Sequence, residues 1–157
     1  FARDSCRTFA VAVSPATVPT SGRPTFSIGE NEMYFGIGAH GERGTRKTKL
    51  LSADETARIL VEETVKDLPF KGGDEVNLIV NGYGSTTLME LFIVNRKIHE
   101  LLNNLDIRIH RTEVGNFLTS QEMGGCSLTL MRLDDELKKC IDAQANTAAY
   151  ARPGKTS

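Results

Sequence analysis

The sequence predicts an α/β fold in which helices pack on a mixed β-sheet. Compact runs of apolar and β-branched residues alternate with segments whose apolar residues recur at helical spacing. The chain has 157 residues, 39% hydrophobic and 25% charged, which is typical of one soluble domain with its own core. We therefore expect residues 1–157 to form a single domain, with residues 144–157 as a tail.

The N-terminal third predicts two strands separated by a loop. Residues 8–13 read TFAVAV, an apolar run typical of a buried strand. Pro15, Pro19 and Pro24 follow, and proline has no amide N–H for a ladder, so we expect a surface loop. Residues 32–35 form a second, short candidate strand.

Two helices flank a buried strand in the middle of the chain. Ser52 and Glu55 have capping-box spacing, which predicts a helix from there to about residue 66. Residues 76–81 are apolar enough for a strand, and residues 86–103 carry the longest helical pattern, with Ser85 or Thr86 as N-cap.

The C-terminal third predicts two more strands and a short helix. Residues 107–111 alternate apolar and basic side chains, as in a strand with one wet face, and residues 118–125 are loop-like. Residues 127–131 are a further strand, and the acidic residues 134–136 favour a helix start. We expect Cys126 and Cys140 to be small core residues.

Composition argues against several classes of partner. Nineteen Lys and Arg against twenty Asp and Glu give a net charge of −1, so we expect no nucleic-acid partner. No apolar run approaches bilayer length, and we expect no membrane insertion. The basic run at residues 43–49 indicates a solvated loop. Three scattered cysteines without a C-x-x-C pair favour a reducing, cytoplasmic setting and give no metal site.

His40 is the first candidate for a working group. It lies in a loop with four glycines, directly after the strand predicted at residues 32–35. Glycine lets backbone or ligand approach closely, and a loop at a strand end holds a side chain on a rigid scaffold. Gly38, Gly41 and Glu42 are the candidate loop partners. The alternative is an ordinary turn with a half-exposed histidine.

Other polar segments leave their interpretations open. Residues 81–85, NGYGS, end a strand before a helix, where backbone amides can bind an anion or simply form a tight turn. His99 and His110 favour surface or structural roles. The polar loop that begins at Thr119 could border the same pocket as His40.

Several motifs together resemble the dihydroxyacetone kinase DhaK (Dak1) family. In order and spacing they are TVP at residues 17–19, GAHGE at 38–42, NGYGST at 81–86 followed by Glu90-Leu91, then Thr119-Ser120, Met123 and SLTL at 127–130. The resemblance covers nearly the entire chain and corresponds to the C-terminal half of that family's substrate-binding domain. It implies the fold of the second DhaK subdomain, with the N-terminal half absent. Phe1, in place of an initiator methionine, also suggests a piece of a longer protein.

The resemblance implies a phosphotransferase that acts on an alcohol group of dihydroxyacetone or a related small ketose. His40 would hold the substrate carbonyl as a covalent hemiaminal, with Gly38, Gly41 and Glu42 as its substrate loop. This chain would carry no cofactor, because ATP or a protein-bound nucleotide with magnesium belongs to a partner domain or subunit. A homodimer is implied too. The family's acid-base residues lie in the absent half, so the isolated chain would be incomplete as a kinase.

Four positions depart from the family pattern. Ala39 and Arg43 replace an Ile and a Pro around the histidine motif, and Tyr83 and Thr87 replace a Leu and a Pro after the 76–81 strand. These changes point to a longer ketose such as erythrulose, or to a relaxed function. Three hypotheses follow: a kinase piece, a ketose-sensing module that docks another protein, and a structural or dimerisation fragment.

Overall fold

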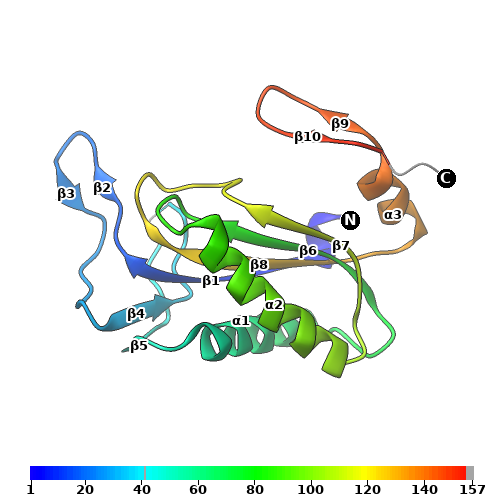
Figure 1. Ribbon diagram of the computed structural model, residues 1–157, viewed down its shortest axis with the longest axis horizontal. Coiled ribbons are helices and arrows are strands. Elements are labelled where there is room, and N and C mark those ends of the chain that lie inside the picture. Colours follow the sequence, from blue (N-terminus) through cyan, green and yellow to red (C-terminus); the bar gives the residue numbers. More distant parts are fainter. Residues whose placement is uncertain (41, 155–157) are drawn as a thin grey trace.

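The computed structural model describes residues 1–40 and 42–154, and it centres on one six-stranded sheet (Figure 1). The strand order is β5-β4-β1-β8-β6-β7, and only β6 and β7 run parallel to each other. A mixed sheet flanked by helices is the predicted fold class, and it is confirmed. The strands are β1 (Cys6–Ser14), β4 (Glu32–Phe35), β5 (Arg46–Lys49), β6 (Glu75–Gly82), β7 (Arg108–Gly115) and β8 (Gly124–Arg132).

Helices α1 (Ala53–Asp67) and α2 (Leu88–Asn104) cover one face of the sheet (Figure 1). Their buried apolar side chains pack with every second residue of the central strands, among them Val11, Leu78 and Leu128. Each helix begins with a full capping box, at Ser52 and at Thr87. The first cap was predicted. The second prediction was wrong, because Thr87 and not Ser85 or Thr86 accepts the N–H of Glu90.

The opposite face of the sheet is more polar. Residues that alternate with the core set point there, including Asn81 of β6 and Ser127 and Thr129 of β8. A small apolar cluster on this side contains Ala10, Ala12, Ala16, Ile37, Tyr83 and Met123. This face is therefore the one that can hold a polar ligand.

Several expectations for the connecting segments were wrong. The proline-rich loop contains a short hairpin, β2 (Thr17–Val18) and β3 (Arg23–Pro24). The basic run contributes an edge strand, β5, rather than a loop, because β4 supplies backbone partners that the composition of the run does not signal.

The two cysteines expected in the core differ. Cys126 is buried, and burial raises its pKa to about 12, whereas Cys140 is exposed and not a core residue.

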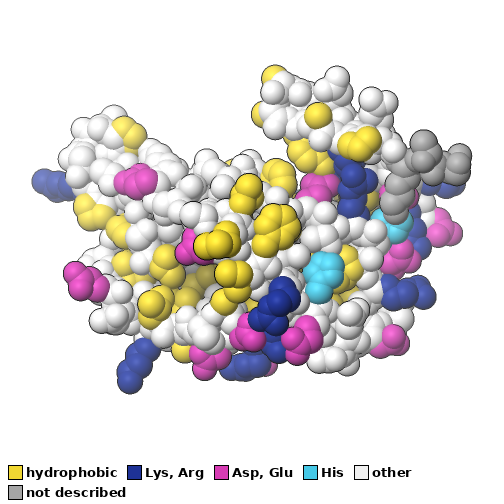
Figure 2. Space-filling view, in the orientation of Figure 1, with side chains coloured by type: hydrophobic (Ala, Val, Ile, Leu, Met, Phe, Trp, Pro, Cys, Tyr) yellow, Lys and Arg dark blue, Asp and Glu magenta, His cyan; other side chains and the backbone are white. Residues whose placement is uncertain are grey.

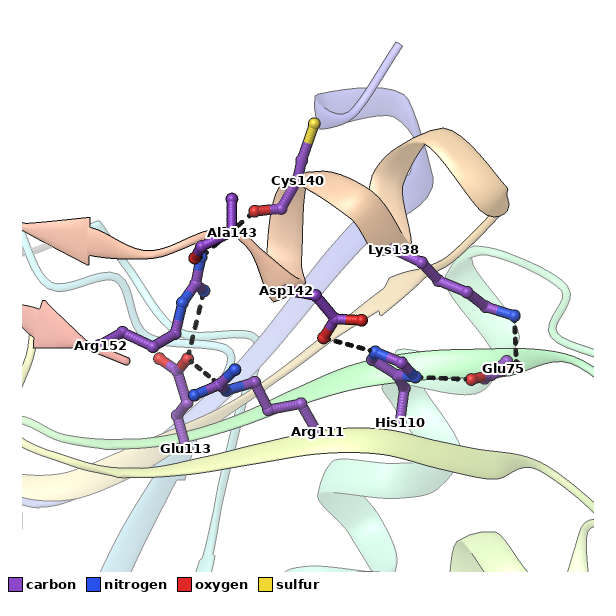
Figure 3. Close-up of polar contacts among 9 residues, drawn as sticks. All are labelled: Glu75, His110, Arg111, Glu113, Lys138, Cys140, Asp142, Ala143 and Arg152. Carbon is purple, nitrogen blue, oxygen red and sulfur yellow. Dashed lines mark hydrogen bonds and ion pairs between the residues drawn. The ribbon is translucent and has the colours of Figure 1, made fainter. Parts of the chain in front are cut away.

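The C-terminal segment lies over the polar side of the sheet and is held there by charge. It consists of α3 (Asp135–Asp142), β9 (Ala145–Asn146) and β10 (Ala151–Arg152), so part of the expected tail is a hairpin. Figure 3 shows His110 of β7 between two carboxylates, with Nδ1 2.8 Å from Glu75 Oε1 and Nε2 2.9 Å from Asp142 Oδ1. Lys138 of α3 also lies 2.6 Å from Glu75.

A second ionic contact ties down the end of the hairpin. Arg152 lies 3.7 Å from Glu113 of β7 and donates to the carbonyls of Cys140 and Ala143 (Figure 3). Both contacts are mostly shielded from solvent: the side chains of His110 and Arg152 are 13% and 12% exposed. Charge-assisted hydrogen bonds are stronger in such surroundings than on an open surface. We infer that they hold α3 and the hairpin in place.

In the part of the chain that the structure describes, no helix is both long enough and apolar enough to span a bilayer.

We expect His110→Ala to lower the free energy of unfolding by about 2 kcal/mol, because hydrogen bonds to two shielded carboxylates are lost. Urea denaturation of the variant and the wild type measures this. His40→Ala is the matched control, since the His40 side chain is 80% exposed and its removal should leave stability within about 0.5 kcal/mol. Equal urea midpoints for His110→Ala and the wild type would contradict a stabilising role for the contacts of His110 with Glu75 and Asp142.

Candidate functional site

His40 lies in the loop between β4 and β5, and the base of that loop is fixed by backbone contacts. Gly36 donates to the carbonyl of Ala10 at 2.8 Å, and Thr45 donates to the carbonyl of Phe35 at 2.8 Å. Gly36 has a φ of 74°, which side chains disfavour. The loop therefore leaves the sheet in one defined direction.

Glu42 orients His40 within this loop. Its carboxylate accepts the backbone N–H of His40 at 3.2 Å, and its other oxygen lies 3.6 Å from Nδ1 of the ring. The second distance is too long for a good hydrogen bond. A Cβ on Gly38 would lie 1.8 Å from the Glu42 carboxylate, so a side chain there would displace Glu42 from its present position. The predicted residues His40, Gly38 and Glu42 thus lie in contact with one another, while Gly41 lies outside the described residues.

A cavity of about 520 Å³ lies beside this loop, on the polar face of the sheet. Its lining combines His40 and Glu42 with Tyr83, Ser127 and Thr129, and with Leu118 of the loop after β7. The polar loop from Thr119 was expected to border the histidine pocket, but no residue from 119 to 126 lines it; of that segment only Ser127 and Thr129, in the strand that follows the loop, do so. The cavity is large enough for a small molecule, and its lining mixes apolar side chains with a few polar ones.

Asn81 holds the segment of Phe117 and Leu118 in the cavity wall, a role that sequence reasoning missed. Its amide donates to the carbonyl of Leu118 at 2.9 Å, and its oxygen accepts the N–H groups of Phe117 and Leu118 at 2.8 Å each. Asn81 is 5% exposed, so these bonds also satisfy a buried polar group. An asparagine at the end of an apolar strand is the only sequence signal for this role.

The glycine-rich turn after β6 serves as a tight turn rather than an anion site. Three residues separate Gly84 from the first residue of α2. At that helix end, the N–H of Thr87 already donates to the carboxylate of Glu90 at 2.9 Å, so an anion would have to compete with Glu90. Gly84 has a φ of 136°, and a Cβ there would lie 1.9 Å from the carbonyl oxygen of Gln121. The turn packs directly on the loop that precedes β8.

The other two histidines lie away from this cavity. His99 of α2 contacts the Thr112 hydroxyl at 3.0 Å, and burial lowers its pKa. His110 belongs to the C-terminal ionic cluster, as described above. Among the described residues, no three His, Cys, Asp or Glu side chains are grouped so that they could hold a metal ion.

Comparisons with known proteins agree on one family. The model of the Dak1 domain matches residues 2–149. The chain is 42% identical over 132 residues to the dihydroxyacetone-binding subunit DhaK of PTS-dependent dihydroxyacetone kinase 1 from Listeria innocua, covering 84% of this chain and 40% of that protein. It is 38% identical over 155 residues to L-erythrulose 1-kinase from Mycolicibacterium smegmatis, covering 96% and 27%.

A solved structure gives the same picture. The dihydroxyacetone kinase operon co-activator Dha-DhaQ superposes with a TM-score of 0.78 at 35% identity, covering 85% of this chain and 41% of that one. The chain therefore spans less than half the length of these relatives.

We expect Gly84→Ala to destabilise the protein by about 3 kcal/mol, because its methyl group meets the Gln121 carbonyl in addition to the cost of positive φ. Gly73→Ala is the matched control: Gly73 also has positive φ, at 88°, but a Cβ there meets nothing within 4 Å. That variant should lose only about 1 kcal/mol. Urea denaturation compares the two, and equal losses would show that the contact with Gln121 is unimportant.

Proposed function

The chain belongs to the Dak1 domain family, and from this we propose that it is part of the substrate-binding portion of a dihydroxyacetone kinase. In this proposal His40 holds a small ketose by a covalent hemiaminal. The observation that carries it is the 80% exposed His40 side chain, oriented by Glu42 at the edge of a polar cavity. The proposal is made for this portion only, since the relatives are more than twice as long.

The chemistry of this anchor suits the loop. A neutral imidazole carries a lone pair on one ring nitrogen near neutral pH. When Nδ1 carries the proton and faces Glu42, the lone pair is on Nε2, which forms a bond to the carbonyl carbon. The C=O π bond breaks, its oxygen gains a proton, and the ring loses the proton of Nδ1. Glu42 supports this step because its negative charge stabilises the ring as positive charge develops on it.

Covalent attachment would also explain selection and transfer. A ketose has a carbonyl that can be captured, whereas glycerol has none. Once anchored, the substrate's free hydroxyl is fixed in orientation, and phosphoryl transfer depends mainly on positioning and charge stabilisation. We assign the nucleotide, either ATP or a protein-bound nucleotide with Mg²⁺, to a partner domain or subunit. The isolated chain would then bind the ketose without completing the transfer.

A second candidate function is ketose sensing without transfer. It is favoured by the similarity to a protein described as an operon co-activator, which lies as close in sequence identity as several kinases do. Both candidates share the ketose site. Formation of phosphorylated dihydroxyacetone after addition of a nucleotide-bearing kinase subunit would favour the kinase.

The surface supports a working form larger than this chain. Figure 2 shows hydrophobic side chains gathered over α2, where Leu88, Met89, Phe92 and Ile93 are 44–70% exposed. Exposed apolar groups in one place are typical of an interaction surface. This surface supports homodimerisation. It also supports the third alternative, a structural or dimerisation fragment.

We expect the carbon NMR spectrum of carbonyl-labelled dihydroxyacetone to gain a bound tetrahedral-carbon signal when the chain is added. His40→Ala should abolish this signal, because no nitrogen remains to attack the carbonyl carbon. His99→Ala is the matched control and should retain the signal. His99 lies on α2, contacts Thr112, and does not line the cavity that contains His40. A signal of equal strength in the His40 variant would refute the covalent anchor.

A further inference from the structure

Tyr83 places a buried phenol in the same cavity as His40. It is 4% exposed, and its ring packs in the apolar cluster that includes Ala10, Ala12 and Met123. Ala39, the residue before His40, packs against that cluster. Tyr83 and the histidine loop are therefore neighbours across the cavity, although they lie far apart in the sequence.

The position of this phenol is fixed by the backbone on both sides. The N–H of Tyr83 donates to the carbonyl of Gly125 at 3.2 Å, and its carbonyl accepts the N–H of Ser120 at 2.8 Å. Gly84, directly after it, is held by close contact with Gln121. A side chain on such a rigid turn is pre-organised for recognition, because little entropy is lost when a ligand binds to it.

The surroundings of the hydroxyl are polar. Tyr83 lines the cavity together with Ser127, itself 4% exposed, and Thr129, while burial raises the pKa of Tyr83. The phenol therefore stays neutral near pH 7. A neutral phenol can both donate and accept a hydrogen bond, so it can bind a ligand hydroxyl in either role.

The cavity has room for a ligand that reaches this group. At roughly 20–30 Å³ for each heavy atom, the six heavy atoms of a triose fill on the order of 150 Å³. The cavity is about 520 Å³. The cavity therefore has room for a ketose anchored at His40 that carries a further hydroxylated carbon.

We propose that Tyr83, with Ser127, is a specificity-determining pair that binds the additional hydroxyl of a four-carbon ketose held at His40. The inference rests on the proposed function and specifies the substrate class of that site. Its physical basis is that a site built to hydrogen-bond a hydroxyl discriminates strongly against a ligand without one, because its buried polar groups are then left unpaired. Tyr83 acts on binding and takes no part in bond formation.

The test compares two labelled ketoses, dihydroxyacetone and erythrulose, titrated into the full chain and followed by the bound tetrahedral-carbon signal. Tyr83→Phe removes only the hydroxyl. We expect it to weaken erythrulose binding about tenfold and to change dihydroxyacetone binding less than about twofold, as the loss of one buried hydrogen bond predicts. Ser127→Ala should change the two affinities in the same directions.

Tyr34→Phe is the matched control. Tyr34 packs edge-on against Phe26 near the same loop, outside the lining of the His40 cavity, and its variant should bind both ketoses as the wild type does. If Tyr83→Phe leaves erythrulose binding unchanged, or weakens both ketoses equally, the specificity role is overturned while the covalent anchor stands. If the wild-type chain binds neither ketose, the proposed function fails, and this inference fails with it.

Discussion

The antiparallel ladder that joins β8 to both β1 and β6 is the constraint on which the rest of the structure depends. It pairs β8 from Gly124 to Met131 with β1 and from Cys126 to Arg132 with β6. β4 pairs with the other edge of β1, and the histidine loop follows β4 in the chain. A slip of one residue in the central pairing would exchange the two faces of the sheet, so the register decides which side chains reach the cavity.

One face of the sheet packs the main apolar core, and the other face lines the cavity. Leu128 and Leu130 point toward α1 and α2 and belong to the main apolar core, whereas Ser127 and Thr129, which alternate with them, line the cavity. Strand geometry enforces this alternation. The polar face can hold hydroxyls and amides at modest cost because the opposite face supplies most of the apolar burial.

Around the candidate site, positions are set by close contacts and by satisfied polar groups. Gly38 leaves space for the Glu42 carboxylate, and Gly84 leaves space for a neighbouring carbonyl. Asn81 holds Phe117 and Leu118 in the cavity wall by three hydrogen bonds. Ionic contacts of the same kind hold α3 against β6 and β7. Tyr150 of the hairpin loop packs edge-on against Phe117, which also lines the cavity.

The sequence by itself determined the fold class, the helix that Ser52 caps, the buried central strands and the family motif around His40, because each leaves a local signal in spacing or residue type. Only the tertiary structure decided that the basic run Arg46–Lys49 is an edge strand, since β4 supplies its hydrogen bonds. The cap of α2 at Thr87 does have a local signal, the capping-box spacing to Glu90, which the prediction of Ser85 or Thr86 missed. The tertiary structure also decided that Tyr83 and Asn81 meet His40 at one cavity. These outcomes depend on pairing and packing between segments distant in sequence, which no local pattern encodes.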